Sequence, residues 1–136
     1  MSSDREGIIQ RQIVSYLYAT CPPDVCWHSV PNEQYGGKDG ARMGARMNAN
    51  GRKSGVADLL VVANGRAHYL EVKAPADGTR YRNHVLKPAG KQSTEQKAFQ
   101  INAEAAGARY AVVWSLDDAI AALTEWNVPT RARRAA

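Results

Sequence analysis

The sequence from Val56 to Ala74, VADLLVVANGRAHYLEVKA, decides the fold of this chain. It contains two apolar runs rich in β-forming residues, Val56 to Ala63 and Arg66 to Ala74. Between them stand Asn64 and Gly65, a pair that type I′ hairpin turns favour because both central residues take positive φ. The stretch therefore predicts an antiparallel hairpin closed by a two-residue turn.

The predicted turn also fixes the register of the hairpin. If Ala63 pairs with Arg66, Asp58 lies directly opposite Glu71, and Lys73 lies on the same face. Directly opposed residues have Cβ atoms about 4.5–5.5 Å apart, so the two carboxylates converge. A bulge would shift this register by one residue.

Two converging carboxylates within apolar strands need a compensating charge, because like charges directly opposed in a half-buried sheet are unfavourable. A divalent cation supplies this charge: Mg²⁺ is commonly held by one or two carboxylates and keeps its other positions for water and phosphate oxygens. Lys73 adds positive charge where such a phosphate would lie. The structural alternative is that Asp58 caps a turn while Glu71 and Lys73 form an ordinary salt bridge. The three groups together favour a functional site.

Helices and further strands are predicted on both sides of the hairpin. The order along the chain is helix, three strands, helix, strand, helix, which is an α/β arrangement. The elements outside the hairpin are a helix capped by Ser2 or Ser3 with Ile9, Ile13 and Leu17 on one face, a short strand over 25–30, a helix that begins at Ser93 or Thr94 and stops at Gly107, a strand over 110–114, and a helix from Ser115 to about Trp126.

The composition describes one moderately basic domain over residues 1–136, with 18 Lys plus Arg, 13 Asp plus Glu and a formal net charge of +5. No apolar run approaches the roughly 20 residues that a membrane-spanning helix needs. The first residues are polar, unlike a secretory signal, so we expect a cytoplasmic location with reduced thiols. Cys21 and Cys26 have no second pair of ligands nearby and are expected to be inert.

Positive charge is concentrated in two segments. A glycine-rich segment at about 36–53 shows no hydrophobic periodicity and is predicted to be a flexible basic loop, and a basic tail occupies about 129–136. Such charge suits a nucleic-acid partner, whose phosphates it would contact with an affinity that falls with salt and carries little sequence information. On charge alone, a merely solvated surface explains them equally well. The candidate DNA-binding residues are Lys38, Arg42, Arg46, Arg52, Lys53, Arg131, Arg133 and Arg134.

Asp58 followed by Glu71-Val72-Lys73 resembles the D…ExK signature of the PD-(D/E)XK nucleases, whose shared restriction-endonuclease-like core has the order αβββαβ around a central mixed four-stranded sheet. Within that superfamily the chain is similar to the VRR-NUC family, the virus-type replication-repair nucleases. The motifs that carry the resemblance extend from about Glu6 to Ala122 and are Glu6-Gly-Ile-Ile-Gln10, Val30-Pro-Asn32, Lys53-Ser-Gly-Val-Ala-Asp-Leu59, Glu71-Val-Lys73 and Gln96.

One position departs from the family pattern. Ala57 stands where the family usually has a proline before the aspartate. A proline there would stiffen the entry to the strand without touching metal or substrate, so we expect the change to be tolerated.

The resemblance implies a role for each motif residue. Asp58, Glu71 and the backbone carbonyl of Val72 would hold Mg²⁺ or Mn²⁺. Lys73 would orient or help deprotonate the attacking water and stabilise charge on the scissile phosphate.

Three further motif residues have alternative readings. Glu6 is a metal ligand or supports one by resemblance, but with Ser3 it also has the spacing of a capping box. Gln10 lies one helical turn further along and would support Glu6. Gln96 is expected to hold Lys73 or the water, yet with Ser93 it also matches a capping box.

The resemblance implies a metal-dependent DNA endonuclease that selects branched, flap or junction DNA in replication, recombination or repair, and we expect it to be encoded by a phage. A homodimer is expected, and no membrane or small-molecule cofactor is involved. The alternatives are a sequence-specific restriction-type nuclease or a catalytically silent DNA-binding module on the same fold. Of the three histidines, only His68 is assigned, to a structural role on the face opposite Glu71.

Overall fold

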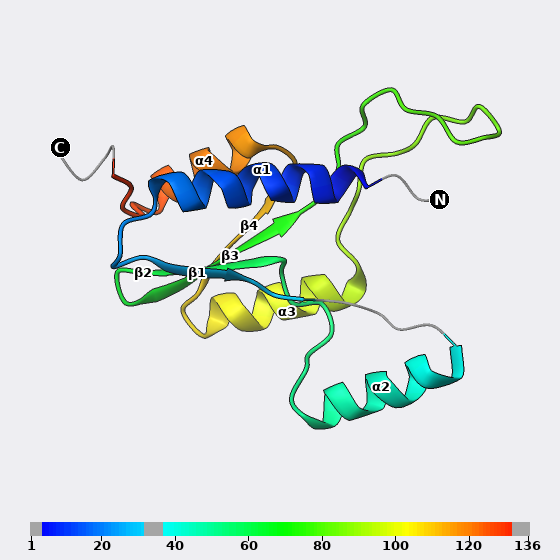
Figure 1. The fold of residues 1–136 in the computed structure, drawn as a ribbon, viewed down its shortest axis with the longest axis horizontal. Coiled ribbons are helices and arrows are strands. Elements are labelled where there is room, and N and C mark those ends of the chain that lie inside the picture. Colours follow the sequence, from blue (N-terminus) through cyan, green and yellow to red (C-terminus); the bar gives the residue numbers. More distant parts are fainter. Residues whose placement is uncertain (1–3, 32–36, 132–136) are drawn as a thin grey trace.

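The computed structural model describes residues 4–31 and 37–131 (Figure 1). Within these ranges a four-stranded sheet is flanked by four helices. The elements in chain order are α1 (Arg5–Thr20), β1 (Cys26–Ser29), α2 (Gly37–Ala49), β2 (Leu59–Ala63), β3 (Arg66–Val72), α3 (Thr94–Ala105), β4 (Arg109–Val113) and α4 (Leu116–Glu125). No helix in the described part of the chain is long and apolar enough to span a membrane.

The sheet is mixed and its strands are adjacent in chain order. β1 pairs with β2 and β2 with β3 in antiparallel fashion, whereas β4 runs parallel to β3 after the crossover through α3. The predicted hairpin register is confirmed, because Ala63 pairs with Arg66 and Leu59 with Leu70. Asn64 and Gly65 have φ of 55° and 73°, as a type I′ turn requires. The order αβββαβ and the α/β fold class are therefore as expected, apart from the additional helix α2.

The main core lies between one face of the sheet and the pair α1 and α4, which run above the strands in Figure 1. Alternate residues of β2 and β3 enter this core, as the two-residue period of a strand dictates. The opposite face is partly covered by α3, where Phe99 packs edge-on against Tyr69 with ring centroids 5.2 Å apart. The buried core residues common to these elements are Ile13, Leu17, Leu59, Val61, Leu70, Val72, Val113, Ala119 and Leu123.

The prediction of a loop at 36–53 was wrong for residues 37–49, which make up most of that segment. Gly37–Ala49 forms α2, despite glycines that lower helix propensity by about 1 kcal/mol each relative to alanine. Asp39 lies in its first turn and Arg46 in its last, which is the charge distribution that the helix dipole favours. The four-residue spacing of the apolar Met43 and Met47 was the signal that could have identified the helix.

The other elements lie where the sequence placed them, with boundaries shifted by a few residues. Ser93 caps α3, and Gly107, with φ of 99°, follows that helix in the left-handed conformation. Ser115 caps α4 by accepting a hydrogen bond from the Asp118 backbone. The N-cap of α1 is Asp4, whose side chain makes no capping hydrogen bond; the predicted caps Ser2 and Ser3 lie outside the described residues.

His68 makes the stability of the fold dependent on pH. The side chain is 2% exposed, and its Nδ1 lies 3.0 Å from the carbonyl oxygen of Val61. Burial lowers the pKa of His68 below its ordinary value of 6.5. Between the lowered pKa and 6.5 the unfolded chain binds more protons than the folded chain. The contribution of His68 to stability is therefore complete above pH 6.5 and is lost as the pH falls through this interval.

We predict that the wild-type melting temperature falls between pH 7.5 and 5.5 by more than that of His68→Phe, measured by circular dichroism. The exposed His28 supplies the matched control, His28→Gln, which should follow the wild type. If the melting temperatures of the wild type and His68→Phe depend equally on pH, the buried ring of His68 is not the source of the pH-dependent stability.

Candidate active site

Asp58 and Glu71 come together where β2 begins and β3 ends. Asp58 directly precedes β2, and its Oδ2 accepts a hydrogen bond from the backbone N–H of Val72 at 2.7 Å. This contact holds the Asp58 carboxylate against the end of β3. The last paired position of the two strands is Leu59 with Leu70, and Asp58 and Glu71 are the next residues beyond it. The hairpin register thus places the two acidic side chains next to each other, as the sequence predicted.

Glu71 is completely buried, and its two carboxylate oxygens have different surroundings. Oε1 accepts hydrogen bonds from the hydroxyl of Tyr110 and from Nε2 of Gln92, the latter at 3.1 Å. Gln92 also donates to Oε1 of Gln100 at 2.8 Å, which fixes its own orientation. Oε2 is buried and has no hydrogen-bond partner. One oxygen is therefore held in place while the other has no donor to satisfy it.

Lys73 is the cation that lies nearest to this unsatisfied oxygen among the ion pairs of the described residues. Its Nζ is 3.9 Å from Oε2 of Glu71, and its side chain is 12% exposed. At this separation the contact is an ion pair and not a hydrogen bond. The ammonium group partly compensates the buried charge but does not satisfy the oxygen.

The electrostatics of the cluster favour an additional cation. Burial raises the pKa of Asp58 above its ordinary value, and the negative charges of Glu6 and Glu71 raise it further. The hydrogen bond from Val72 and the charge of Lys73 act in the opposite direction but do not cancel the effect. A positive charge between the carboxylates would relieve their repulsion.

Tyr110 remains a donor to the site. Burial and, next, the hydrogen bond to Glu71 raise the pKa of Tyr110 far above its ordinary value of 10.0. The hydroxyl therefore stays protonated at neutral pH, and it keeps donating to Oε1 of Glu71.

Glu6 reaches the same cluster from α1. It is exposed in the first turn of that helix, and its charge acts on Asp58. A Cβ built on Gly90 would lie 3.4 Å from Oε1 of Glu6 and 3.3 Å from Cδ of Lys73. Gly90 therefore marks the point where the segment after β3 passes close to both side chains, and the backbone N–H of Gly90 donates to the carbonyl of Ala74 at 2.7 Å.

Gln96 takes part in a helix-capping box with Ser93, which is the alternative that the sequence left open. Its Oε1 accepts a hydrogen bond from the Ser93 backbone at 2.8 Å, while the Ser93 hydroxyl accepts from the Gln96 backbone at 3.1 Å, which completes a capping box. A role of Gln96 toward Lys73 or water remains a prediction. Gln10 is half-buried on α1, and its supporting role also remains a prediction.

Gly55 connects the motif segment before Asp58 to the start of α3. With φ of 80°, it lies so close to that helix that an added Cβ would be 2.4 Å from the carbonyl carbon of Glu95. Only glycine satisfies both the positive φ and this approach. The contact fixes the path of the chain as it enters β2.

The predicted DNA-binding residues lie apart from the carboxylates. Arg42 and Arg46 are exposed on α2, which extends away from the sheet in Figure 1, and Lys53 is exposed in the segment that follows. Arg52 instead donates through Nε to Asn48 at 3.1 Å. Arg131 is exposed; the side chain of Lys38 and both Arg133 and Arg134 lie outside the described residues.

Sequence reasoning missed Gln92, Gln100 and Tyr110 as parts of the site. Tyr110 pairs with Tyr69 across the parallel β3–β4 ladder, two residues before Glu71 and on the same face. Its hydroxyl in an otherwise apolar strand was a signal that a polar partner is needed. No local pattern distinguished Gln92 from the polar residues around it.

The residues present fit a divalent cation. Among the described residues no group of three or more His, Cys, Asp or Glu side chains is placed to hold a metal. Mg²⁺, however, is commonly held by one or two carboxylates and keeps several water molecules. The unsatisfied Oε2 of Glu71 beside Asp58 supplies the required oxygen ligands.

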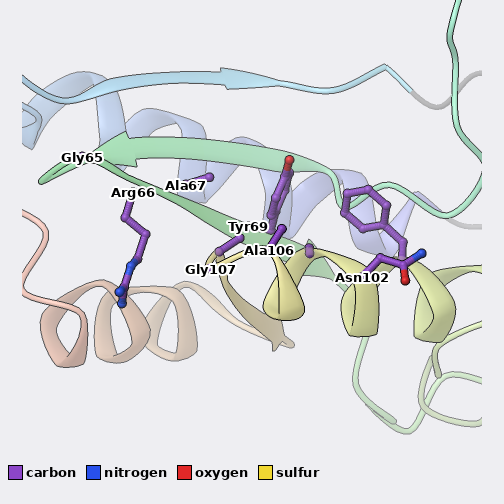
Figure 2. A pocket seen from close by; sticks show the side chains of 10 residues that line it. Gly65, Arg66, Ala67, Tyr69, Asn102, Ala106 and Gly107 are labelled. Carbon is purple, nitrogen blue, oxygen red and sulfur yellow. The ribbon is translucent and has the colours of Figure 1, made fainter.

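An open cavity of about 580 Å³ lies elsewhere, between the β2–β3 turn and α3 (Figure 2). Arg66, Tyr69 and Asn102 are among its lining residues, and none of the clustered ionisable side chains contributes to it. Figure 2 shows Tyr69 on β3 and Asn102 on α3, and small residues at the C-terminal end of α3 also line the cavity. The cavity therefore contains no group suited to hydrolytic chemistry.

No protein-family model matches the chain, and no curated protein matches it by sequence. A solved structure described as a VRR_NUC domain protein is similar to it, with a TM-score of 0.65 over 95% of this chain and 93% of that chain. The sequence identity is 14%, so the similarity concerns the fold. The chain therefore shares the α/β fold of that VRR_NUC domain protein, a mixed four-stranded sheet flanked by helices.

Proposed function

We propose that the chain is a metal-dependent endonuclease that hydrolyses phosphodiester bonds in DNA. The observation that carries the proposal is the buried Oε2 of Glu71, which has no hydrogen-bond partner and lies beside Asp58 and Lys73 in a VRR_NUC-like fold. Leaving a buried carboxylate oxygen unsatisfied costs about 1–3 kcal/mol or more. A functional ligand that binds this oxygen would explain why the protein keeps it unsatisfied.

Asp58 and Glu71 would hold Mg²⁺ or Mn²⁺, with the Val72 carbonyl as a further ligand and Glu6 close enough to support the ion through its charge. The bound ion would lower the pKa of a coordinated water and neutralise charge on the phosphate. Tyr110 and Gln92 would keep Glu71 in one orientation throughout, because both donate to Oε1 and leave the buried Oε2 without a donor.

Lys73 would act on the substrate. Its ammonium group lies beside the carboxylates with only 12% of the side chain exposed, so its charge is weakly screened. From there Nζ can donate hydrogen bonds to the attacking water and to a phosphate oxygen, orient the first and stabilise the charge that builds on the second. Its positive charge would also help to deprotonate the water, because it stabilises the hydroxide that remains when the proton passes to solvent.

The DNA would be held mainly through its phosphates. Arg42 and Arg46 on α2, with Lys53, form an exposed basic surface that projects from the sheet (Figure 1). We propose selection of branched, flap or junction DNA in replication or repair, by a homodimer in the cytoplasm of a phage-infected or bacterial cell.

Sedimentation of the purified chain at micromolar concentration tests the homodimer. A chain that sediments as a monomer at that concentration would exclude it.

The proposed chemistry predicts that Glu71→Ala and Lys73→Ala lower the Mg²⁺- or Mn²⁺-dependent cleavage rate by about 10²–10⁴-fold, the usual effect of losing a positioned catalytic group. Cleavage is measured on a panel of single-stranded, duplex, flap, splayed-arm and four-way-junction DNA. Glu104→Ala and Lys97→Ala, which change exposed side chains of α3, are the matched controls. Absence of metal-dependent cleavage by the wild type on every substrate contradicts the proposal.

Metal binding can also be measured without substrate. Mg²⁺ at ten times its Kd would stabilise the wild type by about 1.4 kcal/mol, which corresponds to a rise in melting temperature of about 5 °C for a domain of this size. Asp58→Asn and Glu71→Gln should lose this rise, while Glu104→Gln should retain it. KCl of the same ionic strength controls for screening. A rise that persists in both active-site variants would locate the ion elsewhere.

The basic residues of α2 are expected to affect the affinity for DNA. Arg42→Ala combined with Arg46→Ala should weaken binding to duplex and branched DNA to a similar extent and reduce the slope of log K against log salt by about 2, if each side chain neutralises one phosphate. The control is Arg11→Ala, because Arg11 is an exposed residue of α1 that pairs with Asp4. An unchanged salt dependence would remove α2 from the DNA interface.

A further inference from the structure

The segment between β3 and α3 contains an ordered hairpin over residues 79–87, where the sequence predicted only a polar loop. Arg80 and Leu86 form an antiparallel bridge, and the backbone N–H of Lys87 donates to the carbonyl of Thr79 at 2.8 Å. At the turn, the N–H of Tyr81 donates to the carbonyl of Val85 at 2.8 Å. In Figure 1 this hairpin projects beyond the N-terminal end of α1. We call it the 79–87 hairpin.

The side chains of the hairpin reinforce its shape. The guanidinium of Arg80 donates to the carbonyl of His84 at 2.7 Å, and Asn83 accepts from the Val85 backbone through Oδ1 at 3.1 Å. His84 has φ of 68°, a left-handed conformation that ends the turn. These bonds close the turn locally, so the hairpin has its shape before any ligand binds.

Both legs of the hairpin are attached at the active site. On the first leg, Arg5 of α1 donates to the carbonyl of Pro75 at 3.1 Å and forms an ion pair with Asp77 at 3.3 Å. Asp77 in turn accepts from the Thr79 backbone at 2.9 Å. On the second leg, the Gly90 N–H is bound to the carbonyl of Ala74, the residue after Lys73.

Gly90 sets how close the second leg comes to the catalytic groups. The space at its missing side chain is bounded by Cδ of Lys73 and Oε1 of Glu6. The Gly90 contacts therefore place the second leg of the hairpin beside these two side chains. A strand whose phosphate reaches Lys73 would lie near this leg.

The hairpin surface combines apolar and positively charged side chains. Tyr81, Val85 and Leu86 are 49%, 54% and 52% exposed, which is unusual for three large apolar residues within six positions. No Asp or Glu occurs between Asp77 and Glu95, whereas the same interval contains four Lys or Arg residues. Lys87 extends over the ring of Tyr81, with Nζ 5.6 Å from the ring centroid. The surface thus attracts a polyanion and offers it an aromatic face.

We propose that the 79–87 hairpin binds unpaired DNA bases beside the scissile phosphate, with Tyr81 as the stacking platform. This inference rests on the proposed nuclease function and assigns its substrate class: duplex DNA that carries a single-stranded branch. Bases within a duplex present only their edges, whereas unpaired bases present their faces, which stack on aromatic side chains. The positive charge of the hairpin holds the phosphates of the same strand.

The test uses the full chain in Ca²⁺, without Mg²⁺ or Mn²⁺, so that binding is measured apart from cleavage. The two ligands are a DNA duplex and the same duplex extended by splayed single-stranded arms, with 2-aminopurine at the first unpaired position. Tyr81→Ala should weaken binding to the splayed DNA on the order of tenfold, as expected for one lost base–aromatic stack. Its affinity for the duplex should change by less than about twofold.

The 2-aminopurine signal distinguishes stacking from a general effect on the fold. The wild type and Tyr81→Phe should change its fluorescence on binding, while Tyr81→Ala should not. The matched control is Tyr18→Ala, which removes a tyrosine that is 74% exposed near the other end of α1. Tyr18→Ala should behave as the wild type with both ligands.

Three outcomes overturn the inference. The first is that Tyr81→Ala loses affinity equally for the duplex and the splayed DNA. The second is that Tyr81→Ala binds the splayed DNA as tightly as the wild type does. The third is that Tyr81→Ala sediments differently from the wild type, which would show that the hairpin is an interface between copies of the chain. The nuclease proposal fails separately, by the absence of metal-dependent cleavage, because the binding measurements require no cleavage.

Discussion

The buried carboxylate of Glu71 is the feature on which the rest of the site depends. Tyr110 and Gln92 donate to one oxygen, and the other has no hydrogen-bond partner although it is excluded from water. A chain that only needed to fold would gain stability from an apolar side chain there. The protein therefore maintains an unfavourable group in a fixed orientation, which is typical of a site that binds a ligand.

The fold brings this group to its partners with few elements. The two-residue turn at Asn64 and Gly65 sets the register that puts Asp58 beside Glu71, and the parallel strand β4 brings Tyr110 to the same face. The segment after β3 then returns past the site at Gly90 before α3 begins. The proposed catalytic groups Asp58, Glu71 and Lys73 thus lie in β3 or directly next to the ends of β2 and β3. The proposed DNA contacts are instead on α2 and the 79–87 hairpin, which project from the sheet (Figure 1).

The parts of the structure that depend on local sequence could be predicted. The hairpin register followed from one dipeptide, and the helix caps Ser93 and Ser115 followed from their positions before amphipathic segments. α2 was missed because its glycines, which lower helix propensity, outweighed the four-residue spacing of Met43 and Met47. The contacts of Tyr110 and Gln92 with Glu71 could not be predicted, because they depend on how β4 aligns with β3 after a crossover and on where the intervening segment returns.

The central claim is that Oε2 of Glu71 is a ligand of a divalent cation. A crystal structure of the protein with Mn²⁺, analysed by anomalous scattering, tests it most directly. The account predicts an anomalous peak at bonding distance, about 2.0–2.2 Å, from both Oε2 of Glu71 and the Asp58 carboxylate. An absence of that peak at saturating Mn²⁺, with Nζ of Lys73 within hydrogen-bond distance of Oε2, would contradict it and show that the cluster is a structural ion pair.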